Sequence, residues 1–276
     1  MDKGILTKDN IFARYENNRI VYYRIDSSIG ADLWDNHWGD NISINLNEYY
    51  RAYLKGYLGR GQLRHVFLKH LPKHGLILEG GCGMGQYVVA LRARGYNCIG
   101  LDFAAKTVKR VKSVLPDLPI KVGNVCDLSL GNESIDAYIS LGVMEHFEDG
   151  PSRALKEAQR VLKRNGLLLV SVPQAFHWRK AASSPENTML PENALFYQYA
   201  FTSWEFRTIL INSGFQVIAE YGYGSHFAFR IRFEKFRSLL KRFPRLAYLD
   251  LLMDRTPIGR NLARMRLFVA RKKKSI

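Results

Sequence analysis

Between Gly75 and Val172, short apolar runs alternate with longer segments in which apolar residues recur at helical spacing. Short apolar runs bounded by turn residues are typical of buried strands, and a longer period of 3.6 is typical of amphipathic helices. The pattern predicts strands at 76–78, 98–101, 120–122, 137–140 and 167–172. It predicts helices at 86–94, 104–115 and 151–163. This alternation indicates βαβ units and a parallel sheet.

The segments on either side of this region follow other patterns. Residues 1–74 are dense in aromatic residues without the alternation, and we predict a helical and irregular N-terminal cap there. Residues 173–202 form a stretch too long for an ordinary connection, and such loops are usually functional or disordered. A helix at 203–211 and strands at 215–219 and 266–270 then complete the sheet. The expected fold class is α/β: a Rossmann-like, seven-stranded, mostly parallel sheet with helices on both faces.

A basic amphipathic helix is expected as an insertion before the last strand. Phenylalanines and a leucine recur every three to four residues between 229 and 243, and the positions between them are largely Arg and Lys. Such a helix suits a membrane interface or a lipid-linked substrate. The alternative is a lid helix whose phenylalanines pack on the protein and whose cations face water. We therefore divide the chain into a cap (1–74), a core (75–225), an insertion (226–263) and a last strand with a basic tail (264–276).

Charge leaves several partners open. The 276 residues include 41 Lys and Arg against 25 Asp and Glu, a formal net charge of +16. This excess attracts polyanions in general, so RNA, anionic lipid and phosphorylated metabolites all remain candidates. No run of 18 apolar residues occurs and the opening residues lack a secretory pattern, so we expect a cytoplasmic protein, with a peripheral membrane contact through 226–243 as an option. Three cysteines without CxxC spacing predict neither a disulfide framework nor a metal site.

A glycine-rich loop follows the first predicted core strand and precedes a helix. Glycines at 81, 83 and 85 let the backbone turn tightly and approach a ligand closely. Asp102 ends the next strand about 20 residues later. A carboxylate there can accept hydrogen bonds from both ribose hydroxyls, or it can cap a helix. Asp127 follows the third strand, where its carboxylate can accept a hydrogen bond from the exocyclic amine of an adenine. Acceptors at successive strand ends predict one crevice at the topological switch point.

Five motifs together resemble a known family: LEGGCGMG at 78–85, GLD at 100–102, NVCD at 124–127, SLGVMEHF at 140–147 and RVLKRNG at 160–166. In order and spacing, over roughly residues 70–220, they are similar to class I S-adenosylmethionine-dependent methyltransferases. The likeness is strongest to type 11 domains, which include the quinone-biosynthesis enzymes. The loop reads GxGxG after an acid rather than the GxGxxG of pyrophosphate-binding loops, which disfavours NAD.

The resemblance implies the cofactor S-adenosylmethionine, the product S-adenosylhomocysteine and a set of contacts. Glu79 would orient the loop or the methionine amine, Leu141 would offer its carbonyl to that amine, and Cys126 would offer its backbone to the adenine. Asn124 departs from the acid that this family commonly has there. The expected cofactor contacts are Glu79, Gly80, Gly81, Cys82, Gly83, Gly85, Asp102, Phe103, Asn124, Val125, Cys126, Asp127 and Leu141.

His146 is the candidate general base for an acceptor hydroxyl, because it follows the fourth strand and an imidazole titrates near neutral pH. The alternative is that His146 only shapes the cofactor pocket or caps a helix, since the Glu145-His146 pair recurs in the family whatever the acceptor. For the acceptor site we predict Trp34, Trp38 and Tyr50 from the cap and Tyr197 from the long loop; packing of the cap is the alternative for each.

The predicted reaction is methyl transfer to a small-molecule, glycan or lipid-linked acceptor, with oxygen favoured over nitrogen or carbon. Residues 140–143 read SLGV instead of the Asn/Asp-Pro-Pro-aromatic motif of base-nitrogen methyltransferases, and no cysteine follows a proline. Nucleic acid is therefore disfavoured as acceptor. Two rival functions stay open: an RNA methyltransferase that uses the basic insertion, and a binding protein that kept the cofactor site but lost turnover.

Overall fold

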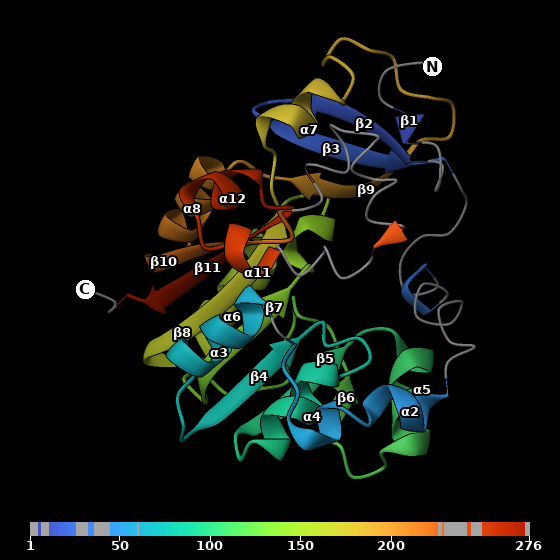
Figure 1. Ribbon diagram of the computed structural model, residues 1–276. Coiled ribbons are helices and arrows are strands. Elements are labelled where there is room, and N and C mark those ends of the chain that lie inside the picture. Colours follow the sequence, from blue (N-terminus) through green and yellow to red (C-terminus); the bar gives the residue numbers. More distant parts are fainter. Residues whose placement is uncertain are drawn as a thin grey trace.

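The computed structural model describes residues 5–6, 11–25, 33–35, 45–59, 61–225, 228, 242–243 and 250–273. A seven-stranded sheet has the order β10-β11-β8-β7-β4-β5-β6 (Figure 1). Its strands are β4 (Leu76–Gly80), β5 (Asn97–Asp102), β6 (Ile120–Val122), β7 (Ile135–Leu141), β8 (Leu162–Pro173), β10 (Phe215–Tyr223) and β11 (Met265–Lys272). Strand β11 runs antiparallel to both of its neighbours, β8 and β10, and the other six strands all run in one direction. The predicted mostly parallel, seven-stranded sheet is confirmed.

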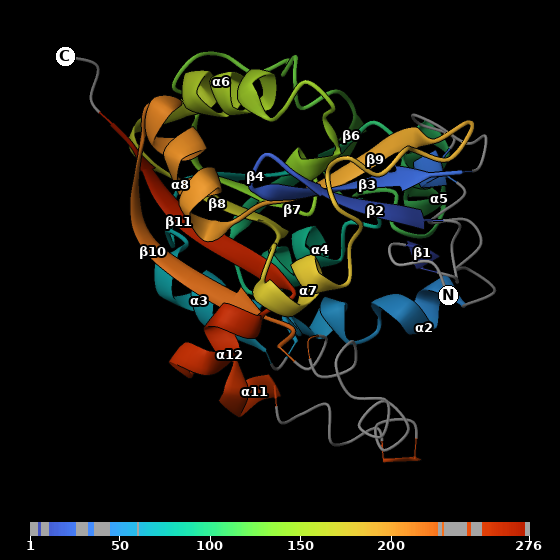
Figure 2. The ribbon, with the colours of Figure 1, turned by 90° about the horizontal axis from the view of Figure 1, so that it is seen from above.

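Helices cover both faces of this sheet (Figure 2). One face packs against α3 (Gln62–His70), α4 (Gln86–Ala93) and α5 (Ala105–Val114), and the other against α6 (Ser152–Val161) and α8 (Ser203–Asn212). Successive strand side chains alternate between the two cores: Ile77 packs in the first and Leu78 in the second. The strands read as continuous apolar runs because both of their faces are buried.

The N-terminal cap differs from the prediction at residues 11–24. They form a hairpin of β2 (Ile11–Glu16) and β3 (Arg19–Arg24) rather than helix or irregular chain. Its two-residue turn needs positive φ, which Asn17 and Asn18 supply at 48° and 65°. The cap is helical as predicted at α2 (Leu46–Tyr50), η1 (Tyr53–Lys55) and α3. Alternating side chains around an Asn-Asn pair were the hairpin signal that the aromatic content obscured.

A second, smaller sheet joins distant parts of the chain. Its order is β1-β2-β3-β9, with β1 at Ile5–Leu6 and β9 at Leu195–Ala200. Strand β9 and the helix α7 (His177–Ala181) lie within the long stretch predicted as a loop. The small sheet lies beyond the carboxyl end of the core strands, at the top of Figure 1. It therefore closes one side of the region where a ligand is expected.

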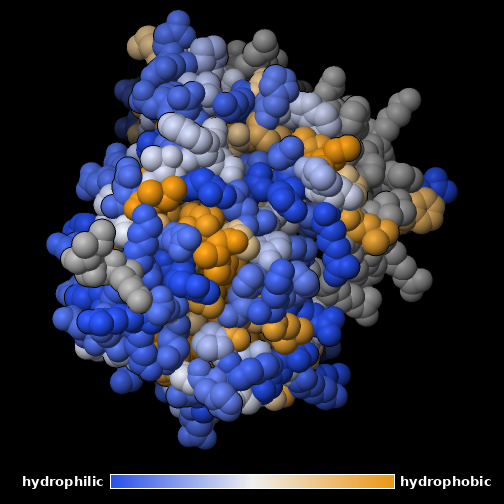
Figure 3. Space-filling model, turned by 90° about the vertical axis from the view of Figure 1, so that its left-hand side faces the viewer, coloured by the Kyte–Doolittle hydropathy of each residue, from blue (hydrophilic) through white to orange (hydrophobic). Residues whose placement is uncertain are grey.

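The predicted basic helix at 226–243 lies, apart from residues 228, 242 and 243, outside the described residues. Two short helices, α11 (Asp250–Met253) and α12 (Pro257–Leu262), precede β11. Among the described residues, no helix combines the length and the apolar character needed to cross a membrane. On the face that Figure 3 shows, hydrophobic side chains lie in small groups within a mainly hydrophilic surface.

Candidate functional site

The topological switch point of the large sheet lies between β4 and β7. From β4 the chain continues to β5 and β6 on one side, and from β7 it continues to β8 on the other. Ligands in open α/β sheets bind where the order reverses, outside the carboxyl ends of the strands. A cavity of about 330 Å³ lies there, and we call it the switch-point pocket.

Residues of the core and of the cap share this pocket. The core contributes the last residues of two strands and residues that follow the strand ends: Gly81, Asp102, Phe103, Gly123, Asn124, Val125, Leu141, Gly142, Val143, His146 and Phe147. The cap and β9 contribute one cation and mostly apolar or aromatic groups: Arg24, Leu33 and Trp34 from the cap, and Leu195, Phe196 and Tyr197 from β9. The pocket is thus polar near Asp102 and aromatic near the small sheet.

The glycine loop is bound to the neighbouring strand. The backbone N–H groups of Gly81 and Cys82 both donate to the carbonyl oxygen of Leu101, at 2.7 and 3.0 Å. Gly81 has a φ of 73°, and a Cβ there would collide with Val143. Only glycine meets both conditions, so the backbone itself forms this wall of the pocket.

Asp102 holds the loop and the start of α5 together. Its Oδ2 accepts the N–H of Gly83 at 2.6 Å and its Oδ1 accepts the N–H of Ala104 at 2.9 Å. Burial raises the pKa of the Asp102 carboxyl, and both N–H donors oppose that shift. Since a carboxylate offers about four lone-pair directions, these two bonds leave acceptor capacity toward the pocket. Asp102 is not the N-cap of α5, because Ala104 holds that position without a side-chain cap, and the N–H that Asp102 accepts there is that of Ala104. The ribose role stays a prediction.

The part of the pocket wall beside Asp102 includes an exposed aromatic ring. Phe103 follows Asp102 in the wall and exposes 44% of its surface, which leaves an aromatic ring available to a flat base. Asn124 and Val125 complete the wall on that side. Of the remaining predicted cofactor residues, Asp127 is exposed and lies outside the pocket wall, as do the buried Glu79 and Cys82.

Glu79 is fully buried behind the loop, and this burial raises the pKa of its carboxyl to about 8. Its Oε2 atom has no hydrogen-bond partner within the described part of the chain. A buried carboxyl of this kind becomes ionised when a cation approaches it. An amine-bearing ligand close to the glycine loop would supply such a cation, so the residues present fit the cofactor that the sequence implies.

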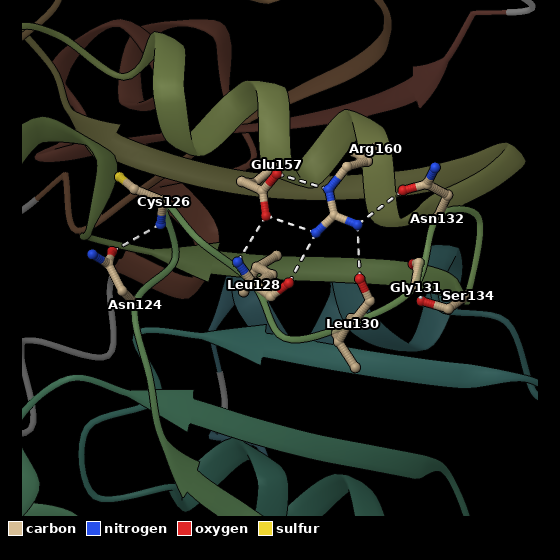
Figure 4. Close-up of polar contacts among 9 residues, drawn as sticks. All are labelled: Asn124, Cys126, Leu128, Leu130, Gly131, Asn132, Ser134, Glu157 and Arg160. Atoms are coloured by element: carbon tan, nitrogen blue, oxygen red, sulfur yellow. Dashed lines mark hydrogen bonds and ion pairs between the residues drawn. The ribbon is translucent and has the colours of Figure 1, made fainter.

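An arginine that the motif analysis did not assign a role fixes the loop after β6 (Figure 4). Arg160 of α6 donates to the carbonyl oxygens of Leu128 and Leu130 at 2.9 and 2.7 Å, and to both carboxylate oxygens of Glu157 at 2.8 Å. Glu157 in turn accepts the N–H of Leu128 at 2.7 Å. The Arg160 hydrogen bonds lower the pKa of the Glu157 carboxyl to about 2.

We call the hydrogen bonds of Arg160 and Glu157 to this loop the Arg160 clamp. The loop that it holds also includes Asn124 and Val125 of the pocket wall. In the same loop, Asn124 Oδ1 accepts the N–H of Cys126 at 2.9 Å, and the N–H of Asp127 donates to the carbonyl oxygen of Asn124 at 3.1 Å. Asn124 thus shapes a tight turn, and the amide at the family's acidic position has a local structural role. The sequence signal for the clamp was the arginine that opens the RVLKRNG motif.

His146 lies where the core meets the cap, on the 3-10 helix η2 (Met144–His146). Its Nδ1 is 2.8 Å from the carbonyl oxygen of Tyr197, which can only accept, so Nδ1 carries the hydrogen. The neutral imidazole then has its basic nitrogen at Nε2. The ring also meets Trp34 and Tyr197 edge to face, with centroids 4.6 and 5.2 Å apart.

The four predicted acceptor residues separate in the structure. Trp34 and Tyr197 line the pocket, whereas Trp38 lies outside the described residues. Tyr50 is fully buried in the core and donates its hydroxyl to the carbonyl oxygen of Met84 at 2.6 Å. Tyr50 therefore supports the glycine loop from behind and is not part of the pocket wall.

Eight residues of the pocket wall were not among the predicted site residues: Arg24 and Leu33 of the cap, Gly123, Gly142, Val143 and Phe147 of the core loops, and Leu195 and Phe196 of β9. The pairing of β3 with β9 sets Arg24 opposite Leu195 and Tyr23 opposite Phe196. Recognition of the Asn17-Asn18 hairpin would have placed Arg24 at a strand end. The pairing of β3 with β9 joins segments far apart in the chain, so no local sequence pattern predicts it.

The comparisons with known proteins agree with this geometry. Residues 78–170 match a family model described as "Methyltransferase domain". Residues 78–170 are a class I, S-adenosylmethionine-dependent methyltransferase domain. A "Probable S-adenosylmethionine-dependent methyltransferase" of Mycobacterium tuberculosis is 29% identical over 146 residues, 53% of this chain and 50% of that protein. The chain therefore spans about half the length of this curated relative.

Two further similarities concern other acceptors. A tRNA (carboxymethyluridine(34)-5-O)-methyltransferase of Arabidopsis thaliana is 32% identical over 113 residues, 39% of this chain and 26% of that protein. The solved 1,6-didemethyltoxoflavin-N1-methyltransferase of Burkholderia thailandensis, with 1,6-didemethyltoxoflavin and S-adenosylhomocysteine bound, aligns with a TM-score of 0.51 and 14% identity over 95% of this chain and 99% of that one. At this identity the methyltransferase domain shares the fold, and no more follows.

Proposed function

We propose that this protein transfers a methyl group from S-adenosylmethionine to a small, ring-bearing acceptor, with a hydroxyl oxygen as the favoured methyl recipient. The observation that carries the proposal is the composition of the switch-point pocket. Asp102 and Phe103 line one part, and His146, Trp34 and Tyr197 line another part of the same cavity. A cofactor and an acceptor held in one cavity can meet without water between them.

The residues of the core would hold the cofactor. When bound, S-adenosylmethionine supplies a methyl group on a positively charged sulfur. The side-chain-free wall at Gly81 would admit it closely, Asp102 would accept hydrogen bonds from the ribose hydroxyls, and Phe103 would contact the base. Glu79 lies behind the glycine loop, where its buried carboxyl favours a nearby cation.

Trp34 of the cap, Phe196 and Tyr197 of β9 and His146 of the core would hold and activate the acceptor. The aromatic side chains at 34, 196 and 197 favour a flat apolar molecule and exclude water from it. His146 Nε2 would take the proton of an acceptor hydroxyl, and that oxygen would receive the methyl group as the methyl–sulfur bond breaks and S-adenosylhomocysteine leaves. The hydrogen bond to the Tyr197 carbonyl sets the orientation of the imidazole for that step.

The first experiment is calorimetric titration of the protein with S-adenosylmethionine and S-adenosylhomocysteine. Asp102→Ala should weaken binding by about 1.5 to 3 kcal/mol, the cost of losing a charged hydrogen-bond partner. Asp117→Asn is the matched control, because Asp117 is exposed and lies outside the pocket. A folded wild-type protein that binds neither compound would refute the proposal.

Acceptor identity is tested next by following S-adenosylhomocysteine release with phenols, hydroxylated quinones and structured RNA. Turnover with the phenolic compounds supports the proposal. Turnover with RNA alone would favour the first rival function, to which the tRNA-modifying relative from Arabidopsis thaliana adds weight. Tight cofactor binding without turnover on any acceptor class would favour the second rival, a binding protein.

A further inference from the structure

A second hollow, separate from the switch-point pocket, lies between α3 and the turn that joins α11 to α12. Its volume is about 380 Å³, and Figure 2 shows α3, α11 and α12 on the same side of the large sheet. It is lined by Gly61, Arg64, His65, Leu68, Lys69 and Arg255. None of these residues lines the switch-point pocket, so methyl transfer does not account for the hollow.

The periodicity of α3 places the cations of this hollow on one side. Val66 and Phe67 face the core and are fully buried. Arg64 and Leu68 lie four residues apart, so they share a face, and both are exposed. Arg255 approaches from a segment nearly two hundred positions away in sequence. The fold therefore gathers Arg and Lys side chains that the sequence keeps apart.

Acidic partners for these cations are absent from the described residues. Within the part of the chain that the structure describes, no acidic side chain forms an ion pair with Arg64, Lys69 or Arg255. The Lys69 ammonium lies 6.0 Å from the centre of the Tyr221 ring, a contact that leaves its charge unneutralised. Asp254, next to Arg255, is buried and accepts the N–H groups of Gly224 and Ser225.

The positive field reaches a neighbouring histidine. Burial lowers the pKa of His70, and Lys69 and His65 lower it further by charge repulsion. Unpaired like charges around a concave surface are a net cost to the folded chain unless an anion offsets them. Concavity also focuses the potential, which raises the local concentration of anions.

We propose that this hollow binds a single phosphate or diphosphate group of a small molecule. Arg64 and Arg255 carry planar guanidinium groups that match phosphate oxygens two at a time, and Lys69 adds a point charge. Three cations around one hollow fit one or two phosphate groups. A nucleic acid would need a longer track of phosphate contacts to bind comparably. The site is independent of the proposed methyl transfer, and its failure would leave that proposal intact.

The test is isothermal titration of the full chain with inorganic phosphate and with pyrophosphate, at an ionic strength held constant with sodium chloride. Arg64→Gln and Arg255→Gln should each weaken pyrophosphate binding by roughly tenfold, because each removes charge-assisted hydrogen bonds. Lys121→Gln is the control with the same net charge. Lys121 is exposed on β6, at the opposite edge of the sheet from β10, which α3 contacts.

Binding that falls in both arginine variants and persists in Lys121→Gln supports the site. Equal losses in all three variants would mean attraction to the overall charge and would overturn it. No heat with phosphate or pyrophosphate would also overturn it. Binding of structured RNA or of vesicles containing phosphatidylglycerol, without pyrophosphate binding, would replace it with an extended polyanion surface. S-adenosylmethionine affinity, measured alongside, should be the same in every variant.

Discussion

His146 and Tyr197 are joined by a hydrogen bond from the imidazole Nδ1 to the Tyr197 carbonyl oxygen, at 2.8 Å, across 51 positions of sequence. The bond links the core to β9 of the smaller sheet. It fixes which nitrogen of His146 is basic, because a carbonyl cannot donate. The orientation of the proposed base thus depends on the element that forms the acceptor wall.

The first prediction concerns this histidine. His146→Asn should lower turnover by roughly 10² to 10⁴, the range for loss of a general base, while S-adenosylmethionine affinity stays within about twofold of wild type. Titration calorimetry and steady-state release of S-adenosylhomocysteine measure the two effects separately. His177→Asn is the control, because His177 is exposed on α7 and lies outside the pocket. Unchanged turnover in His146→Asn would reduce His146 to a pocket-shaping residue.

The second prediction concerns the Arg160 clamp on the loop after β6. Arg160→Gln should weaken S-adenosylmethionine binding by about tenfold and lower the free energy of unfolding by about 1 to 3 kcal/mol, because Leu128 and Leu130 lose a charged donor. Urea denaturation and titration calorimetry provide the two measurements.

Arg153→Gln is the matched control for the clamp. Arg153 is exposed on the same helix and forms none of the clamp hydrogen bonds. A variant in which stability falls but cofactor affinity does not would show that the loop keeps its shape without Arg160. The clamp would then be structural only.

The core of this fold and part of its site could be predicted because their signals are local. The strands are doubly buried and read as apolar runs, and the glycine loop and Asp102 follow successive strand ends. The cap could not be predicted in the same way. Its wall depends on the pairing of β3 with β9, which brings Arg24 opposite Leu195 across the small sheet. The sequence does not distinguish a tyrosine such as Tyr50, which is buried in the core, from one such as Tyr197, which lines the pocket. Their positions become clear only in the packed structure.

The third prediction separates these two tyrosines. Tyr50→Phe removes the hydroxyl that donates to Met84 behind the glycine loop, so it should lower the free energy of unfolding by about 1 kcal/mol and weaken cofactor binding. Its acceptor KM should not change. Tyr197→Ala should instead raise the acceptor KM, because Tyr197 lines the pocket. A raised acceptor KM in Tyr50→Phe would return Tyr50 to the acceptor site.

The fourth prediction follows from Glu145, whose carboxyl is fully buried. Glu145 lies on η2, next to the pocket residue His146. Burial raises its pKa from the ordinary value of 4.5 to about 8, with Arg179 opposing the shift. Its Oε2 atom has no hydrogen-bond partner within the described ranges. Since the unfolded chain releases this proton near pH 4.5 and the folded chain holds it to about pH 8, stability should fall as pH rises between those values.

Glu145→Gln cannot ionise, so this part of the pH dependence should disappear. Relative to wild type, the variant should gain on the order of 1 to 3 kcal/mol of unfolding free energy between pH 5 and pH 8, at up to about 1.4 kcal/mol per pH unit. Urea denaturation at both pH values measures the difference. Glu148→Gln serves as the control, because Glu148 is exposed. Parallel pH profiles for wild type and Glu145→Gln would mean that Glu145 ionises in the folded protein near its ordinary pKa, with a nearby cation such as Arg179 compensating for its burial.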